Sequence, residues 1–321
     1  MNSMTSTPRS GVFVSHVGHV VRFAGAALLP CAALLGACDK SEPPAPSAPA
    51  ASASTNSAAT TPQAGPVRAS GSSALQPLVN AAKEKYEAEN KGTSIEVSAG
   101  GSKKGLADVN SGAVHIGNSD IFAPDDLKSG LVDHKVAVVG FAAMANKGPY
   151  SEKVAALSLQ DLSRIFAGTV KNWKEVGGES QPIVVINRAA GSGTRTVFGN
   201  IVLGGDKFVE SQTEDNSGAL VAKLKQTKGA ISYLALSFKD DELKTFAVKG
   251  DSGVTEPTTA NITSGAYPIW SYEHMYTKGE PTAGAKAFLD YIGSPAFQEN
   301  VLPNVKGFIP ITQMKISREK D

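Results

Sequence analysis

The chain has 321 residues, of which 41% are hydrophobic, 19% are charged and 32 are glycine. Its 31 basic and 30 acidic residues leave a formal charge of +1, and this balance, without a basic stripe or tail, argues against a nucleic-acid-binding protein. No apolar run reaches the ~18–20 residues of a membrane span, which excludes a polytopic membrane protein, and two cysteines cannot form a disulfide framework.

The first 37 residues have the organisation of a secretory signal. They contain Arg9 and Arg22 and no acidic residue, and an apolar stretch occupies residues 23–37. A charged n-region followed by an apolar h-region of this length is typical of a signal peptide. The stretch ends in Leu-Gly-Ala-Cys38, which resembles the lipobox of bacterial lipoproteins, where the cysteine is acylated. We therefore expect a lipid on Cys38; the alternative is an ordinary signal peptide with an incidental cysteine.

The next segment has the composition of a linker. Residues 39–66 contain six prolines and no aromatic or large aliphatic residue, so they cannot bury enough apolar surface to fold. We therefore expect residues 38–66 to consist of the lipid-anchor cysteine and a disordered Ala/Pro/Ser linker. This linker would tether a folded part close to a membrane.

Helical and strand patterns alternate from residue 67 onward. The first half predicts a helix with its apolar face at Leu75, Leu78, Val79, Ala82 and Tyr86, a strand at 94–97, a helix at 104–110, and strands at 113–117 and 136–144. The second half predicts a helix opened by the capping box Ser158–Asp161, a strand at 183–186, a helix with apolar residues Val197, Phe198, Ile201 and Val202, a strand at 231–236 and a helical region at 288–301. Strands flanked by helices of this length predict an α/β fold with parallel or mixed sheets covered on both faces.

Three turns rich in glycine and serine each precede a predicted helix, at residues 70–73, 100–103 and 191–194. A helix N-terminus presents unpaired N–H groups and partial positive charge, and glycine lets an anion approach the backbone. One such turn alone is usually an ordinary helix cap. Three in one chain, none with the spacing of a nucleotide-binding loop, predict a site for an anion.

Two charged residues lie beside these turns. Arg188 ends the strand Pro-Ile-Val-Val-Ile-Asn, and Asp120 follows Gly-Asn-Ser at the end of another strand. Ligands of open α/β sheets bind at the carboxyl ends of strands, and arginine suits bidentate binding of tetrahedral oxyanions. The alternatives are a surface arginine and a turn-capping aspartate.

Seven separated strings of this sequence resemble, in family order, the phosphate-binding proteins of phosphate ABC transporters. They are GSSALQPLV (71–79), GGSKKGL (100–106), IGNSD (116–120), IFAGTVKNW (165–173), NRAAGSGTR (187–195), GAISY (229–233) and YPIWSYEHMYTKGEP (267–281). The resemblance implies a two-lobed, type II periplasmic-binding-protein fold with the ligand in the interlobe cleft. It also implies that residues 67–142 and 232–321 form lobe 1 and that residues 143–231 form lobe 2.

The resemblance further implies the phosphate-binding residues. Carried over motif by motif, they are Ser73, Ala74, Leu75, Ser102, Asp120, Arg188, Ser192, Gly193 and Thr194. One departure concerns Ala190, because many relatives carry an acid at this place, two residues after the arginine; Arg188 is therefore expected to be braced differently. We rank three neighbours of these nine residues lower, as contributors to the electric field of the site: Lys103, Ser119 and Arg195.

Together with the predicted signal and lipid anchor, the resemblance implies an extracytoplasmic, lipid-anchored receptor that binds inorganic phosphate and delivers it to the permease subunits of an ABC importer. We expect a monomer that is not an enzyme and needs no cofactor. We also expect no metal site, since the five histidines show no ligand-like spacing. One alternative is a receptor for another oxyanion such as sulfate or molybdate. Others are a sensor or adhesin on the same fold, and a hydrolase using Ser73 or Ser192, although neither serine lies in G-x-S-x-G.

Overall fold

The computed structural model describes residues 66–320, all of which belong to one compact unit. The predicted signal peptide, Cys38 and nearly all of the linker lie outside the described residues. No helix within residues 66–320 is long and apolar enough to cross a membrane.

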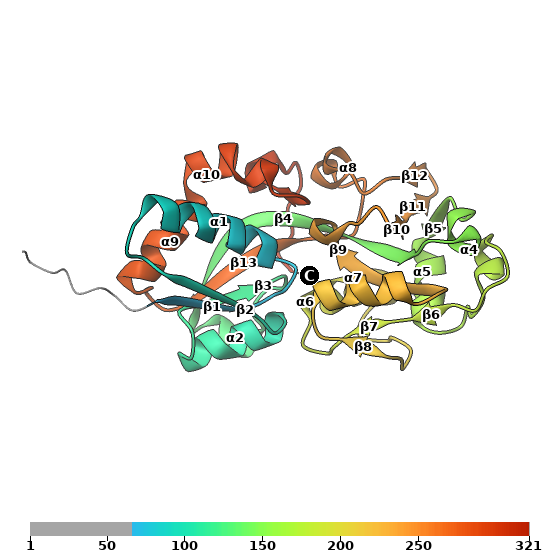
Figure 1. The fold of residues 1–321 in the computed structure, drawn as a ribbon, viewed down its shortest axis with the longest axis horizontal. Coiled ribbons are helices and arrows are strands. Elements are labelled where there is room, and N and C mark those ends of the chain that lie inside the picture. Colours follow the sequence, from blue (N-terminus) through green and yellow to red (C-terminus); the bar gives the residue numbers. More distant parts are fainter. Residues whose placement is uncertain (1–65, 321) are drawn as a thin grey trace, which may run out of the picture. The chain divides into compact units, whose positions relative to one another are not determined.

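The largest sheet is mixed, and one long strand connects its two halves. Its order is β2-β1-β3-β13-β4-β9-β6, with β10 and β14 also paired to β4. Strand β4 pairs with β13 along residues 131–140 and with β9 along residues 141–145, so it passes from one half to the other (Figure 1). The strands are β1 (Val67–Gly71), β2 (Ile95–Ala99), β3 (Ile116–Ser119), β4 (Leu131–Asn146), β6 (Val184–Val185), β9 (Ala230–Ala235), β10 (Leu243–Thr245), β13 (Trp270–Lys278) and β14 (Phe308–Ile309).

Helices cover both faces of the first half of this sheet. In Figure 1, α1 (Gln76–Glu89) lies above β1 and β2, and α2 (Ser102–Ser111) lies below them. The buried face of α1 consists of Leu78, Val79, Ala82 and Tyr86, as the apolar spacing predicts. Of the remaining helices, α3 (Asp125–Lys128) and α9 (Ala283–Gly293) pack on β4, and α10 (Pro295–Asn300) packs on α9. Helix α8 (Thr259–Ser264) lies at the middle of β4, where Ile262 approaches Gly140.

The second half contains shorter strands and several capped helices. Its helices are α4 (Pro149–Glu152), α5 (Leu159–Phe166), α6 (Gly193–Leu203) and α7 (Ser217–Gln226). The capping box of Ser158 and Asp161 is confirmed at the start of α5. Two small sheets accompany them: β12 (Gly253–Thr255), β11 (Ala247–Gly250) and β5 (Ala156–Ser158) form one, and β7 (Asn187–Arg188) with β8 (Thr213–Glu214) forms the other. Because β10 pairs with the end of β4 and β11 pairs with β5, residues 243–250 lie against the segment 143–231. The lobe limits stay a prediction.

The predicted and observed elements differ mainly at their ends. The strand expected at 113–117 occupies 116–119, and the one expected at 183–186 is reduced to two residues. The helical region 288–301 consists of two helices, because Pro295 begins a new one and the Ser294 hydroxyl caps it at the N–H of Phe297. Proline fits the first turn of a helix but not its interior.

Candidate functional site

Each of the three glycine-serine turns leads into a helix, as predicted. The first precedes α1, the second ends where α2 begins at Ser102, and the third ends where α6 begins at Gly193. In the first turn the Ser72 hydroxyl accepts the N–H groups of Ala74 and Leu75, at 3.0 and 3.1 Å. In this structure these two backbone groups are therefore satisfied within their own turn.

The second and third turns are in direct contact. The backbone N–H of Lys103 donates to the carbonyl of Gly191 at 3.1 Å. Gly193 lies so close to the second turn that an added Cβ would overlap the Ser102 hydroxyl and lie 3.0 Å from Asp120 Cβ. Only glycine fits at this contact. The first N–H groups of α2 and α6, which have no partner within their helices, are thus brought to one place.

Asp120 lies directly after β3 and is only 1% exposed. Its backbone N–H donates to the Ser102 hydroxyl at 2.9 Å. One carboxylate oxygen accepts the Ser72 hydroxyl, and the other accepts the Thr194 hydroxyl at 2.8 Å. Asp120 therefore joins all three turns: its carboxylate binds the first and the third, and its backbone N–H binds the second. The carboxylate acts only as an acceptor.

Arg188 ends β7 and is also only 1% exposed. Its guanidinium donates to the backbone carbonyls of Glu214 and Asp215, at 3.3 and 3.2 Å. It also donates to the hydroxyls of Ser73 and Ser217, at 3.0 and 3.3 Å. A guanidinium has five N–H donors, so three remain for the hydroxyls and a ligand once the two carbonyls are satisfied. Burial lowers the pKa of Arg188 and the charge of Asp120 opposes this, but arginine stays protonated near neutral pH.

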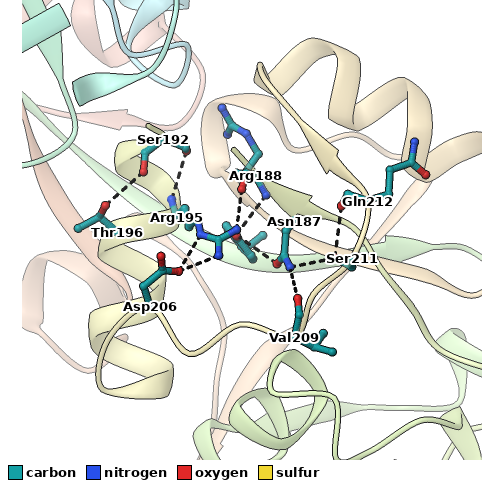
Figure 2. Close-up of polar contacts among 10 residues, drawn as sticks. Asn187, Arg188, Ser192, Arg195, Thr196, Asp206, Val209, Ser211 and Gln212 are labelled. Carbon is teal, nitrogen blue, oxygen red and sulfur yellow. Dashed lines mark hydrogen bonds and ion pairs between the residues drawn. The ribbon is translucent and has the colours of Figure 1, made fainter. Parts of the chain in front are cut away.

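The backbone of Arg188 is braced without an acid at position 190. Its N–H donates to the Tyr233 hydroxyl at 3.2 Å, and its carbonyl accepts from the Arg195 guanidinium at 2.8 Å. Figure 2 shows Arg195 between this carbonyl and the carboxylate of Asp206. Arg188 is therefore held without an acid at position 190. The Tyr233 hydroxyl and the Arg195 guanidinium hold its backbone, and the carbonyls of residues 214 and 215 hold its side chain.

Ser217, which the sequence analysis did not select, belongs to the same cluster. It is fully buried at the first turn of α7. Its hydroxyl lies 3.0 Å from that of Ser73, and its backbone N–H donates to the Ser73 hydroxyl at 3.2 Å. The string Asn-Ser-Gly at 216–218 has the same composition as the other turns and is the signal that could have revealed a fourth helix N-terminus.

The structure buries all nine predicted binding residues: Ser73, Ala74, Leu75, Ser102, Asp120, Arg188, Ser192, Gly193 and Thr194. Ser73 meets Arg188, and Asp120 meets Ser102 and Thr194, across long stretches of sequence. The Ser192 side chain instead caps its own helix, accepting the N–H of Arg195 at 3.2 Å. Within residues 66–320 no group of three or more His, Cys, Asp or Glu side chains could hold a metal ion.

The chemistry of the cluster suits one class of ligand. A protonated guanidinium, several hydroxyls and the helix N-termini donate hydrogen bonds and attract negative charge. Each oxygen of the Asp120 carboxylate already accepts one hydroxyl, and it can accept a further hydrogen bond but donate none. The arrangement therefore complements a small oxyanion that also carries at least one O–H group.

Comparisons with known proteins agree with this chemistry. The family model described as a PBP superfamily domain matches residues 56–296. The chain is 46% identical over 260 residues to "Phosphate-binding protein PstS" of Bacillus subtilis (strain 168), covering 79% of this chain and 84% of that protein. It is 28% identical over 242 residues to the protein of the same name from Staphylococcus saprophyticus, covering 71% and 75%.

A solved structure gives the corresponding match in three dimensions. The putative phosphate ABC transporter substrate-binding protein from Clostridium perfringens, solved with bound phosphate, aligns with a TM-score of 0.71 at 30% identity, covering 76% of this chain and 99% of that one. A phosphate transport receptor from Vibrio cholerae, with a TM-score of 0.60 at 22% identity and coverage of 76% and 99%, shares the fold. The chain therefore has the two-lobed periplasmic-binding-protein fold and belongs to the family of phosphate ABC transporter substrate-binding proteins.

Proposed function

We propose that this protein captures inorganic phosphate outside the cytoplasm and delivers it to the permease subunits of an ABC importer. The observation that carries the proposal is the burial of both Arg188 and Asp120 in one cluster of hydroxyls and helix N-termini. The relatives' names support the substrate and the transport role, and they support a binding protein rather than an enzyme.

Phosphate fits this pair of charges better than a fully deprotonated oxyanion does. Arg188 supplies charge-assisted hydrogen bonds to any tetrahedral anion. The Asp120 carboxylate accepts a hydrogen bond from the O–H that phosphate retains near neutral pH, whereas sulfate would present a lone pair to it. The nine predicted binding residues, with Ser217 beside them, form the proposed site.

Calorimetric titration of the purified protein with phosphate, sulfate, arsenate and a phosphate monoester tests the function. Phosphate should bind, and sulfate should bind at least about 10²-fold more weakly, since sites that demand one hydrogen-bonding group discriminate strongly. The monoester should bind more weakly than phosphate because both charged side chains are buried. No heat with phosphate, or sulfate binding as tightly as phosphate, would contradict the proposal.

We further propose that the protein is a monomer held at the outer face of the cell membrane by lipid on Cys38, which is the periplasmic face in a cell with two membranes. Cys38→Ala should release the protein into the soluble exported fraction or leave it unprocessed, because each buried lipid CH₂ contributes about 0.8 kcal/mol to membrane attachment. Fractionation with detection of the protein checks this. A Cys38→Ala protein that stays with the membrane at mature size would refute the lipid anchor.

A further inference from the structure

The Arg195 guanidinium connects the anion-site cluster to a surface loop. Its side chain is 15% exposed, whereas that of its partner Asp206 is 62% exposed. Nη1 donates to the Arg188 carbonyl at 2.8 Å, and Nε and Nη2 both lie 2.8 Å from one carboxylate oxygen of Asp206 (Figure 2). One planar group therefore bridges the binding arginine and the loop after α6.

An aromatic ring fixes the plane of this bridge. The guanidinium carbon of Arg195 lies 4.6 Å from the ring centre of Phe208. Phe208 in turn packs against Tyr233, with 5.1 Å between ring centres, and Tyr233 accepts the backbone N–H of Arg188. The hydrogen bonds and the ring contact together leave the Arg195 side chain little freedom.

The bridge sets the position of two parts of the site relative to each other. Arg195 belongs to the first turn of α6, one residue after Thr194, and its own N–H is capped by the Ser192 hydroxyl. The same residue holds the carbonyl of Arg188 on β7. The Arg195 side chain therefore links Arg188 to the first turn of α6, in addition to the backbone bond from the Ser192 N–H to the Ala189 carbonyl at 2.9 Å.

The charge of Arg195 is a poor explanation for its presence. Its guanidinium is paired with the Asp206 carboxylate, so the two charges largely cancel at a distance. If Arg195 attracted the anion through its charge, the neighbouring Asp206 carboxylate would reduce that attraction. A positioning role for Arg195, by contrast, requires both residues, because Asp206 holds the Arg195 guanidinium in place.

We propose that Arg195, held by Asp206, is a positioning residue of the anion site that fixes Arg188 against the N-terminal turn of α6. The proposal rests on phosphate binding at this site. Arg195 has no contact with the ligand in this scheme. It acts by keeping the donors of β7 and α6 at the spacing that one tetrahedral anion requires.

The two explanations predict opposite signs for Asp206→Asn. If Arg195 acts through its field, removal of a nearby negative charge leaves phosphate binding unchanged or strengthens it. If Arg195 acts by positioning, the amide holds the guanidinium less firmly and binding weakens, by about 3-fold or more. Arg195→Lys keeps the charge but loses the planar fork, so positioning predicts a loss of about 10-fold or more.

The experiment measures the Kd of inorganic phosphate by titration for the wild-type protein and these variants. Glu179→Gln is the matched control, because it removes one carboxylate from the exposed pair with Lys153 and should leave Kd within about 2-fold. Asp206→Glu restores the carboxylate and should recover part of the affinity lost in Asp206→Asn. Thermal unfolding of each variant without phosphate shows whether it is folded.

The outcomes separate this proposal from the proposed function. Weaker binding by Asp206→Asn and Arg195→Lys, with recovery in Asp206→Glu, supports positioning. Wild-type affinity in Arg195→Lys, or equal or tighter binding by Asp206→Asn, overturns it while phosphate binding itself stands. If the wild-type protein fails to bind phosphate, the proposed function is refuted, and the positioning role, which rests on it, is refuted with it.

Discussion

Arg188→Lys should weaken phosphate binding by about 10²- to 10⁴-fold. Lysine keeps the positive charge but has a point-like ammonium in place of the planar fork of donors. A hydrogen bond to a charged group contributes about 1.5–3 kcal/mol, so losing two of them gives a change of this size. The carbonyls of residues 214 and 215 also accept from Arg188, and a lysine cannot serve them and an anion together.

Titration of Arg188→Lys with phosphate measures this effect, and Arg164→Lys is its control. Arg164 lies on the surface, 3.8 Å from Asp161 in α5, so the same exchange there should leave phosphate affinity unchanged. Thermal unfolding without phosphate separates lost binding from lost structure. A folded Arg188→Lys protein that binds phosphate within about 3-fold of wild type would exclude Arg188 as the main anion-binding group.

Local sequence patterns predicted those parts of the fold and site that depend on neighbouring residues. The apolar spacing of α1, the capping box at Ser158 and the glycine-serine turns are local features, and the structure has them. The sequence predicts that Asp120 and Arg188 lie at strand ends, and in the structure β3 ends at Ser119 and β7 ends at Arg188. Contacts between residues far apart in sequence then bring both side chains to one cluster.

The elements that the sequence analysis missed lack such local signals. Strand β13 is buried along residues 270–277, and its alternation of apolar and polar residues runs only from Trp270 to Glu273, because the register shifts between Glu273 and His274. Strand β4 is longer than its apolar centre because its exposed first residues pair with β13. Ser217 reaches the site through the pairing of β7 with β8, which places the start of α7 beside Arg188. The Asn-Ser-Gly turn at 216–218 indicates a helix N-terminus, but no local pattern indicates that this turn lies beside Arg188.

Asp120→Asn should narrow the preference for phosphate over sulfate by about 10²-fold or more. The wild-type carboxylate accepts the hydroxyls of Ser72 and Thr194 and can only accept a further bond. Sulfate therefore meets it with a lone pair inside a buried site, where an unpaired charge costs several kcal/mol. Asparagine has nearly the same shape but adds an N–H donor, which should admit sulfate and weaken the bond to the phosphate O–H.

Competition titration with both anions on wild type and Asp120→Asn gives the ratio of affinities directly. Asp290→Asn is the matched control: it removes one negative charge from the exposed pair with Lys286 and should leave the ratio unchanged if the effect requires a carboxylate at the anion. Arg188 and the helix N-termini attract both anions, so they raise affinity without setting this ratio. An unaltered ratio in Asp120→Asn would assign selectivity to another group, and the buried carboxylate would then have only a structural role in joining the first and third turns.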